Sequence, residues 1–314
     1  MKAGQGGSGG DLCLFLVDVY NKAEFKSDAA SKARVLTLMR AFPQGEPTRK
    51  RFIGEAIAYV YLRVNARHST WLTECRWSSK YGEFPAGDPE LHHVAGTLYA
   101  EGERRYRTDA DSKLMRLVED DTYDAERHLI LGTKDSPAIL AQMEFEWYTE
   151  DEPSTAPLYA ARAVLPYLLT GNVRAANQTL LLFSSRLGQS KQNLGVQEVT
   201  SKSSDLRVYP SLPLLNFLHL LLLAIQRGSP DLFRQLKSHY AVHLKDVGTW
   251  DEAMAQIGEM YFGIKIPQQH NPLFDMMGSL LMGGGGGGGG GGQSGRRTPR
   301  TVGVQAPAPP PGPD

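Results

Sequence analysis

The stretch that decides the fold is a helix opening after a tight turn, Asn172-Val173-Arg174-Ala175-Ala176. A second stretch of this kind lies earlier in the chain, Thr122-Tyr123-Asp124-Ala125-Glu126. Both stretches place a small alanine near the start of a helix, where it allows a neighbouring helix to approach closely. The two stretches therefore predict stacked helix pairs. A compact helical bundle is the alternative.

Outward from these two stretches, apolar residues recur with the helical period along most of the chain. Asp11 is predicted to be the N-cap of the first helix, and prolines follow capping residues at Asp88-Pro89 and Ser229-Pro230. Thr249-Trp250-Asp251-Glu252 fits a capping box. After the helix at Asp11, we expect helices at 29–42, 89–101, 122–134, 136–149, 154–170, 172–187, 212–227, 230–245, 250–263 and 271–282.

One stretch departs from the helical period. Val196, Glu198 and Thr200 alternate with Gln197, Val199 and Ser201, and a second β-prone run from Leu206 to Tyr209 follows a polar turn. Two such runs around a turn predict a β-hairpin over residues 196–209, with an ordinary long loop as the alternative. The expected fold class is all-α: a right-handed superhelix of tetratricopeptide-like helix pairs, an α-solenoid, with one short β-hairpin insertion.

Composition excludes several classes of partner and location. Lys plus Arg and Asp plus Glu are both 34, so no basic field attracts nucleic acid. Two cysteines are typical of a reducing cytosol. The most apolar run, 214–225, is too short for a membrane span of ~20 residues. Residues 283–314 are rich in Gly and Pro, and we expect a disordered tail there.

No arrangement of side chains in the sequence requires a reaction to explain it. Gly4-Gln5-Gly6-Gly7-Ser8-Gly9 matches a dinucleotide-binding pattern, but no strand precedes it. His239 and His243 lie four residues apart on one predicted helix, without an evident third metal ligand. We expect no catalytic residue, no cofactor and no metal. An enzyme with a histidine metal site is an alternative that metal analysis tests.

Several segments together carry a resemblance to a known family. They are Gly4–Leu12, Phe84–His92, Tyr123–His128, Leu131–Ser136, Asn216–Leu218 and Phe274–Leu281. Their combination, in this order, resembles the Golgi-to-ER traffic protein 4 family, and the chain is identified as a fungal member of it. The match spans almost everything from Lys2 to Gly283.

The resemblance implies a cytosolic, non-enzymatic scaffold that helps to deliver tail-anchored proteins to the ER membrane. In this family the N-terminal half contacts an ArsA-type targeting ATPase, and the C-terminal half binds a ubiquitin-like adaptor, partly through a β-hairpin. The complex links an upstream tetratricopeptide co-chaperone to the ATPase, favours its ATP-bound state and restrains hydrolysis. Neither nucleic-acid binding nor direct membrane insertion is implied.

Candidate contact residues follow from these roles. Asp11 matches the acidic residue that lies near the ATPase interface. The candidate adaptor contacts are Val196, Val199, Leu206, Val208, Tyr209 and Phe217. Another helical-repeat scaffold, such as a proteasome- or signalosome-type subunit, is the alternative; a winged-helix pattern at the C-terminal end would favour it, and the sequence lacks one.

The expected organisation has four parts. A Gly-rich turn covers 1–10, an ATPase-side half covers 11–190, an adaptor-side half covers 191–282 and the tail covers 283–314. Two 18-residue segments, 59–76 and 102–119, interrupt the resemblance. We interpret both as inserts that form surface excursions, with retained introns as the hypothesis for their origin. The family's opening helices are expected to be missing, which would weaken ATPase binding.

Overall fold

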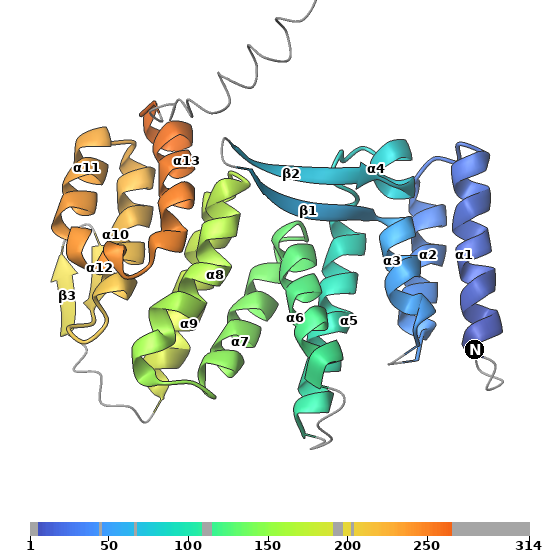
Figure 1. Cartoon of the computed structure of the whole chain (residues 1–314), viewed down its shortest axis with the longest axis horizontal. Coiled ribbons are helices and arrows are strands. Elements are labelled where there is room, and N and C mark those ends of the chain that lie inside the picture. Colours follow the sequence, from blue (N-terminus) through green and yellow to red (C-terminus); the bar gives the residue numbers. More distant parts are fainter. Residues whose placement is uncertain are drawn as a thin grey trace, which may run out of the picture. The chain divides into compact units, whose positions relative to one another are not determined.

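The structure is a computed structural model that describes residues 6–43, 46–65, 68–108, 115–190, 197–201 and 204–265. These residues belong to one compact unit, 1–267. Helices dominate it (Figure 1). Their bounds are α1 Gly6–Lys22, α2 Ala29–Ala41, α3 Thr48–Ala56, α4 Trp77–Tyr81, α5 Pro89–Thr108, α6 Met115–Ile130, α7 Ser136–Tyr148, α8 Ala156–Leu169, α9 Val173–Gln189, α10 Pro213–Arg227, α11 Pro230–His239, α12 Ala241–Lys245 and α13 Asp251–Phe262.

The helices pack as consecutive neighbours and as next-but-one neighbours. Helix α5 contacts α6 and α7, α7 contacts α8 and α9, and α8 contacts α10. This pattern is typical of stacked helix pairs. Small residues line the contacts in α8 and α9, where Ala160, Ala163, Ala175 and Ala176 are buried. The all-α fold class predicted from the sequence is confirmed.

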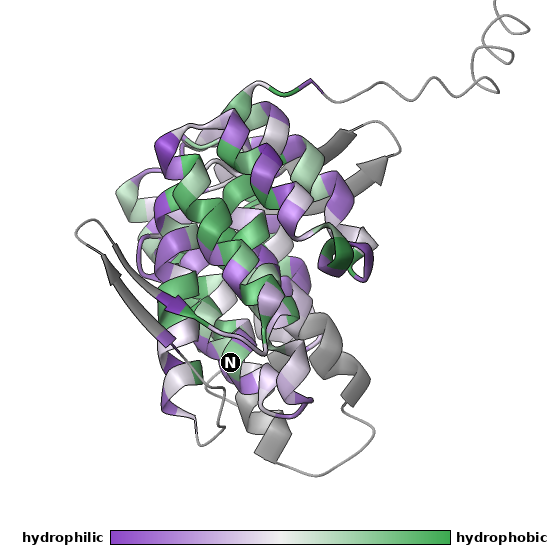
Figure 2. Ribbon diagram, turned by 90° about the vertical axis from the view of Figure 1, so that its left-hand side faces the viewer, coloured by the Kyte–Doolittle hydropathy of each residue, from purple (hydrophilic) through white to green (hydrophobic). Residues whose placement is uncertain are grey.

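Burial of apolar side chains holds the stack together. The largest fully buried side chains include Trp77, Tyr148, Tyr167 and Phe217. Full burial of each such side chain contributes roughly 2–3 kcal/mol. Figure 2 views the molecule from the α10–α13 end and shows hydrophobic residues running along the helices, with hydrophilic residues between them.

The first helix begins earlier than the sequence predicts. Helix α1 starts at Gly6, so the expected Gly-rich turn over 1–10 is helical from that residue, and Asp11 is not an N-cap. Close packing against α3 explains why position 10 is a glycine. A Cβ on Gly10 would clash with Thr48 Oγ1 and would lie 2.9 Å from Thr48 Cβ. Glycine therefore allows α1 to lie close against α3.

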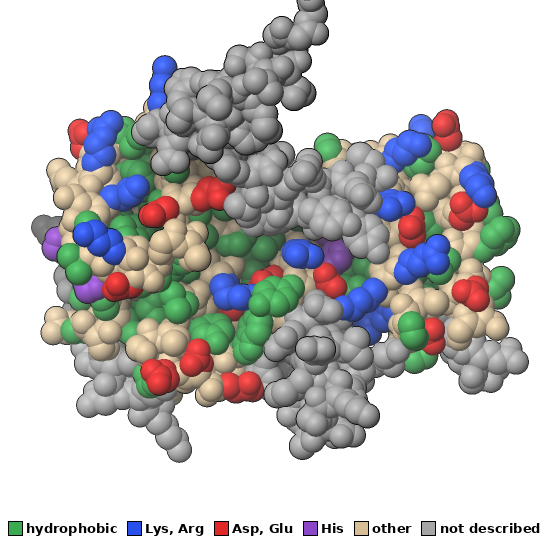
Figure 3. Space-filling model, in the orientation of Figure 1, with side chains coloured by type: hydrophobic (Ala, Val, Ile, Leu, Met, Phe, Trp, Pro, Cys, Tyr) green, Lys and Arg blue, Asp and Glu red, His purple; other side chains and the backbone are tan. Residues whose placement is uncertain are grey.

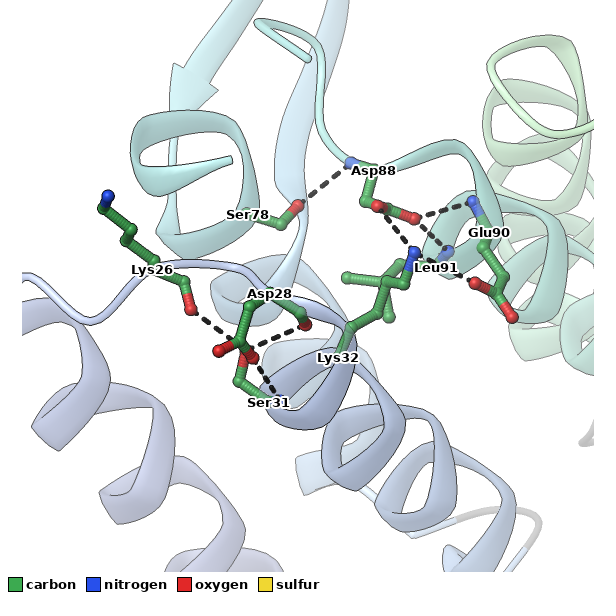
Figure 4. Close-up of polar contacts among 8 residues, drawn as sticks. All are labelled: Lys26, Asp28, Ser31, Lys32, Ser78, Asp88, Glu90 and Leu91. Carbon is green, nitrogen blue, oxygen red and sulfur yellow. Dashed lines mark hydrogen bonds and ion pairs between the residues drawn. The ribbon is translucent and has the colours of Figure 1, made fainter. Parts of the chain in front are cut away.

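Two aspartates cap helices, and the second of them also joins α2 to α5 (Figure 4). Asp28 accepts a hydrogen bond from the backbone N–H of Ser31 at 2.8 Å. Asp88 caps α5, as predicted, by accepting from the N–H of Glu90 at 2.9 Å. Lys32 of α2 then bridges to Asp88 at 3.2 Å and to Glu90 at 3.0 Å. These contacts dock α2 onto the start of α5.

A second hairpin, which the sequence analysis does not predict, lies within the first interruption. Strand β1 (Ala58–Asn65) pairs antiparallel with β2 (His68–Cys75), and the two contact α3 and α4. The run Tyr59-Val60-Tyr61-Leu62 is rich in β-prone residues and is the signal that identifies a strand. In the second interruption, α5 continues to Thr108 and α6 begins at Met115.

Two predictions near the C-terminal end are wrong in detail. The helix expected at 230–245 is two helices, because the chain breaks at Tyr240, whose ring packs edge-on against Phe217. The predicted capping box at Thr249 does not form; instead a 3-10 turn, Gly248–Trp250, leads into α13 and buries Trp250. The cap at Ser229 is confirmed. The helix expected at 271–282 lies outside the described residues.

Candidate functional site

The predicted β-hairpin is present. Strand β3 (Gln197–Ser201) pairs antiparallel with β4 (Ser204–Val208). The register places Val199 opposite Leu206 and Gln197 opposite Val208. Val199 and Leu206 are therefore cross-strand partners in the hairpin. Val196 lies outside the described residues.

Tyr209 anchors the base of the hairpin to the helices. Its backbone N–H donates to Asn216 Oδ1 at 2.8 Å, and Asn216 Nδ2 donates back to the Tyr209 carbonyl at 2.8 Å. The Tyr209 hydroxyl donates to the carbonyl oxygen of Ser184 on α9 at 3.4 Å. The chain leaving β4 is thus held by α10 and α9 together.

A half-buried histidine supports this anchor. The ring of His219 stacks on that of Tyr209, with centroids 6.3 Å apart and planes 13° apart. His219 Nε2 lies 3.0 Å from Ser184 Oγ. Burial, with a smaller effect of the Arg207 charge, lowers the pKa of His219 to about 4. His219 is therefore neutral near pH 7 and acts as a packing and hydrogen-bonding residue.

The other predicted adaptor contacts divide by burial. Tyr209 and Phe217 are fully buried, so neither offers surface to a partner in this structure; both support the hairpin and the helices beneath it. The ring of Phe217 lies edge-on to Tyr240, 5.6 Å away, and 6.5 Å from Trp250. Val208 is half-buried. The adaptor contact itself stays a prediction.

Sequence reasoning missed three residues that position the hairpin, namely Ser184, Asn216 and His219. Asn216 and His219 are the two polar residues that interrupt the most apolar run of the chain, 214–225. A polar side chain in such a run must find a hydrogen-bond partner when its helix is buried. This interruption of an apolar run is the sequence signal that could have identified both residues.

The predicted ATPase-facing residue lies on an exposed helix face. Asp11 is exposed in the second turn of α1. The same helix exposes Leu12, Phe15 and Val19, at 69%, 63% and 41%. Beside them, α1 and α2 form an apolar hollow of about 460 Å³, lined by Leu16, Ala33, Arg34, Thr37 and Leu38.

A histidine pair joins α5 to α6. His92 Nδ1 lies 2.8 Å from His128 Nδ1, and His92 Nε2 lies 2.9 Å from the carbonyl oxygen of Ala86. A carbonyl only accepts, so His92 carries its proton on Nε2, and His128 Nδ1–H must donate to His92 Nδ1. Burial lowers the pKa of His92 to about 4 and that of His128 well below 6.5.

This pair is structural rather than catalytic in character. The His92 ring is fully buried and the His128 ring is half-buried, and Tyr99 stacks on His128 with centroids 5.8 Å apart. Gly87, with φ of +106°, brings the preceding turn so close that a Cβ would lie 2.9 Å from His92 Nε2. The pair therefore explains the segments Phe84–His92 and Tyr123–His128 as one packing unit.

The proposed histidine metal site is not formed. His239 ends α11 and His243 lies in α12, so the two are not on one helix. No group of three or more His, Cys, Asp or Glu side chains that could hold a metal ion occurs in the part of the chain that the structure describes. Over the same residues, none of the helices has the length and apolar character needed to cross a bilayer.

Comparisons with known proteins agree on one family. A family model described as Golgi to ER traffic protein 4 matches residues 1–281. Golgi to ER traffic protein 4 of Aspergillus fumigatus is 52% identical over 289 residues, covering 89% of this chain and 73% of that protein. The protein of that name in Schizosaccharomyces pombe is 29% identical over 280 residues, covering 89% and 78%. A solved structure, "Crystal structure of C. therm. Get4", aligns with a TM-score of 0.71 and 51% identity, over 91% of this chain and 79% of that chain.

Proposed function

The chain belongs to the Golgi to ER traffic protein 4 family, and from this premise we propose that it is a non-catalytic scaffold in the targeting of tail-anchored proteins to the ER membrane. In this role it acts in the cytosol and connects a ubiquitin-like adaptor to the targeting ATPase, and through the adaptor to a tetratricopeptide co-chaperone. Its relatives are named as traffic proteins, which favours this role over a proteasome- or signalosome-type subunit or an enzyme.

The observation that carries the proposal is the anchored β3–β4 hairpin. A two-stranded hairpin alone is marginally stable in water, so it needs a helix or a partner beside it. Tyr209 and Asn216 fasten its base to α10 by two hydrogen bonds of 2.8 Å each. A hairpin anchored in this way is already ordered before a partner binds, which lowers the entropic cost of binding.

The experiment measures binding to the N-terminal segment of the organism's ubiquitin-like adaptor. Val199→Asp with Leu206→Asp puts two charges at a pair of cross-strand partner positions in the hairpin. We expect this double variant to weaken binding at least ~10-fold, since interface cores are depleted of charge. Val242→Asp, at an exposed apolar position on α12, is the matched control and should bind normally. Equal binding by all three proteins refutes the hairpin as the contact.

The ATPase side is tested separately. Asp11 is exposed on α1, and we propose that it faces the ATPase. Asp11→Lys should lower affinity for the ATPase several-fold and lower it most at low ionic strength, because the contact is electrostatic. Asp231→Lys, an exposed position on α11, is the control. Unchanged ATPase binding with Asp11→Lys removes this residue from the interface.

A further inference from the structure

A surface on α6, α7 and α8 is not used by either proposed contact. It consists of Tyr123, Trp147, Leu158 and Tyr159, and we call it the aromatic face. Tyr123 is 44% and Leu158 39% exposed, and the other two are half-buried. Figure 3 shows hydrophobic side chains gathered over these helices, with acidic side chains along their lower edge.

The side chains of the aromatic face form one continuous surface. The ring centroids of Tyr123 and Trp147 are 6.2 Å apart, and those of Trp147 and Tyr159 are 6.1 Å apart. Leu158 precedes Arg162 by one helical turn and so shares its side of α8. Rings from three helices therefore lie side by side, at distances typical of aromatic pairs.

The aromatic face already binds one cation of its own chain. The guanidinium of Arg162 lies 5.1 Å from the Tyr123 ring centroid and 4.8 Å from that of Trp147. Arg162 Nε also donates to Glu126 at 2.9 Å, and the buried Glu144 lies 3.6 Å away. The local arrangement thus shows rings and carboxylates placed around a guanidinium, the geometry of cation–π recognition.

Carboxylates border the aromatic face. Glu150, Asp151 and Glu152 follow Thr149, the C-cap of α7, and all three are exposed. Asp151 accepts a hydrogen bond from the Tyr159 hydroxyl at 3.1 Å, which joins the acidic edge to the rings. Among the residues that the structure describes, neither Asp151 nor Glu152 forms an ion pair with a lysine or arginine. Their charge is therefore available to a partner.

We propose that the aromatic face binds a cationic segment of a partner protein, with arginine or lysine side chains beside an apolar residue. The apolar residue would pack on the rings next to Leu158, while the cations would meet the acidic edge. An acidic border repels phosphate, so nucleic acid is the wrong chemistry. This contact lies on helices other than the hairpin and goes beyond the scaffold role proposed above.

The test uses the full chain and two synthetic peptides of repeating Leu-Arg-Ser, or of Leu-Glu-Ser as the charge-reversed control, in a calorimetric titration. The arginine peptide should bind and the glutamate peptide should not. In the variant E150Q/D151N/E152Q, affinity for the arginine peptide should fall about tenfold, because three partly screened charge contacts are lost. The variant D231N/D246N/E259Q makes the same charge change on exposed residues of the C-terminal helices and should bind normally.

A third variant separates the rings from the charge. Y123A with L158S removes exposed apolar surface without changing charge and should also weaken binding several-fold, with its helical circular dichroism unchanged. Equal losses in the two triple variants would mean only a general electrostatic attraction and would overturn the proposal. So would equal binding of both peptides or binding of neither. Self-association of the full chain that L158S abolishes would assign the face to a second copy instead.

Discussion

At the scale of single residues, the position of the hairpin depends on Asn216. Its amide makes both a donor and an acceptor contact with the Tyr209 backbone. We predict that Asn216→Ala lowers the free energy of unfolding by about 1–3 kcal/mol, because two backbone groups lose their partners. Gln226→Ala truncates an exposed amide on the same helix and should change it by less than about 0.5 kcal/mol. Urea unfolding measures both; equal effects would contradict the anchor.

Three histidines with lowered pKa values make stability depend on pH. Burial lowers the pKa of His92 and His219 to about 4 and that of His128 well below 6.5. Each is neutral in the folded chain and titrates near pH ~6.5 when unfolded, so the unfolded state binds more protons below that pH. Stability is therefore fully present above about pH 6.5 and falls as the pH drops toward about 4, by up to ~1.4 kcal/mol per pH unit for each histidine.

Urea unfolding at several pH values checks this prediction. The free energy of unfolding should decrease steadily as the pH is lowered from neutral. His219→Gln should reduce that slope, because one of the three titrating groups is removed, even though the variant is less stable at neutral pH. Parallel pH profiles for the wild type and His219→Gln would show that His219 binds protons equally well in the folded and the unfolded chain.

At the scale of elements, the packing of α1 against α3 distinguishes two glycines of one helix. A Cβ on Gly10 would clash with the Thr48 side chain, whereas one on Gly7 meets nothing within 4 Å. Gly7→Ala should stabilise the chain by up to about 1 kcal/mol through helix propensity. Gly10→Ala should instead destabilise it by about 1–3 kcal/mol through overpacking. Thermal unfolding distinguishes them; stabilisation by both would mean that α1 is loosely packed.

The sequence predicts most elements, and two of the misses lie at contacts between residues that are distant in the sequence. Apolar period and caps such as Asp88 locate the middle helices correctly. Near the start of α1, Gly10 packs against Thr48, and at the break between α11 and α12, Tyr240 packs against Phe217. Both partners come from elsewhere in the chain. Glycine and a mid-helix tyrosine carry no local sign of such tertiary contacts, because propensity describes an isolated segment.

At the candidate site, too, the local sequence pattern does not reveal contacts between distant residues. Alternation of apolar and polar residues locates the β3–β4 hairpin, since side chains of a strand alternate between two faces. It does not tell that Tyr209, the last residue of the pattern, turns inward to α9 and α10 and is fully buried. Which face of a hairpin meets the helices is decided by packing against residues distant in the sequence, so local alternation does not reveal it.

At the scale of the whole molecule, each helix depends mainly on its neighbours in the stack. Phe217 links α10 to Tyr240 and Trp250, and its truncation leaves a cavity there. We predict that Phe217→Ala costs about 3–5 kcal/mol and speeds amide exchange in α10–α13. Exchange in α1–α3 should stay unchanged, because stacked pairs pass stability to near neighbours. Uniformly faster exchange across the chain would indicate one global unfolding unit.

The histidine pair between α5 and α6 also has a consequence for the family's history. The carbonyl oxygen of Ala86 can only accept a hydrogen bond, so His92 carries its proton on Nε2. His92 Nδ1 therefore has no proton and can only accept from His128. Substituting either histidine leaves a ring nitrogen of the other without its hydrogen-bond partner. The two positions are therefore not free to change independently. Lineages that abandon one histidine should abandon the other as well, and sequences from many species will show whether these positions change together.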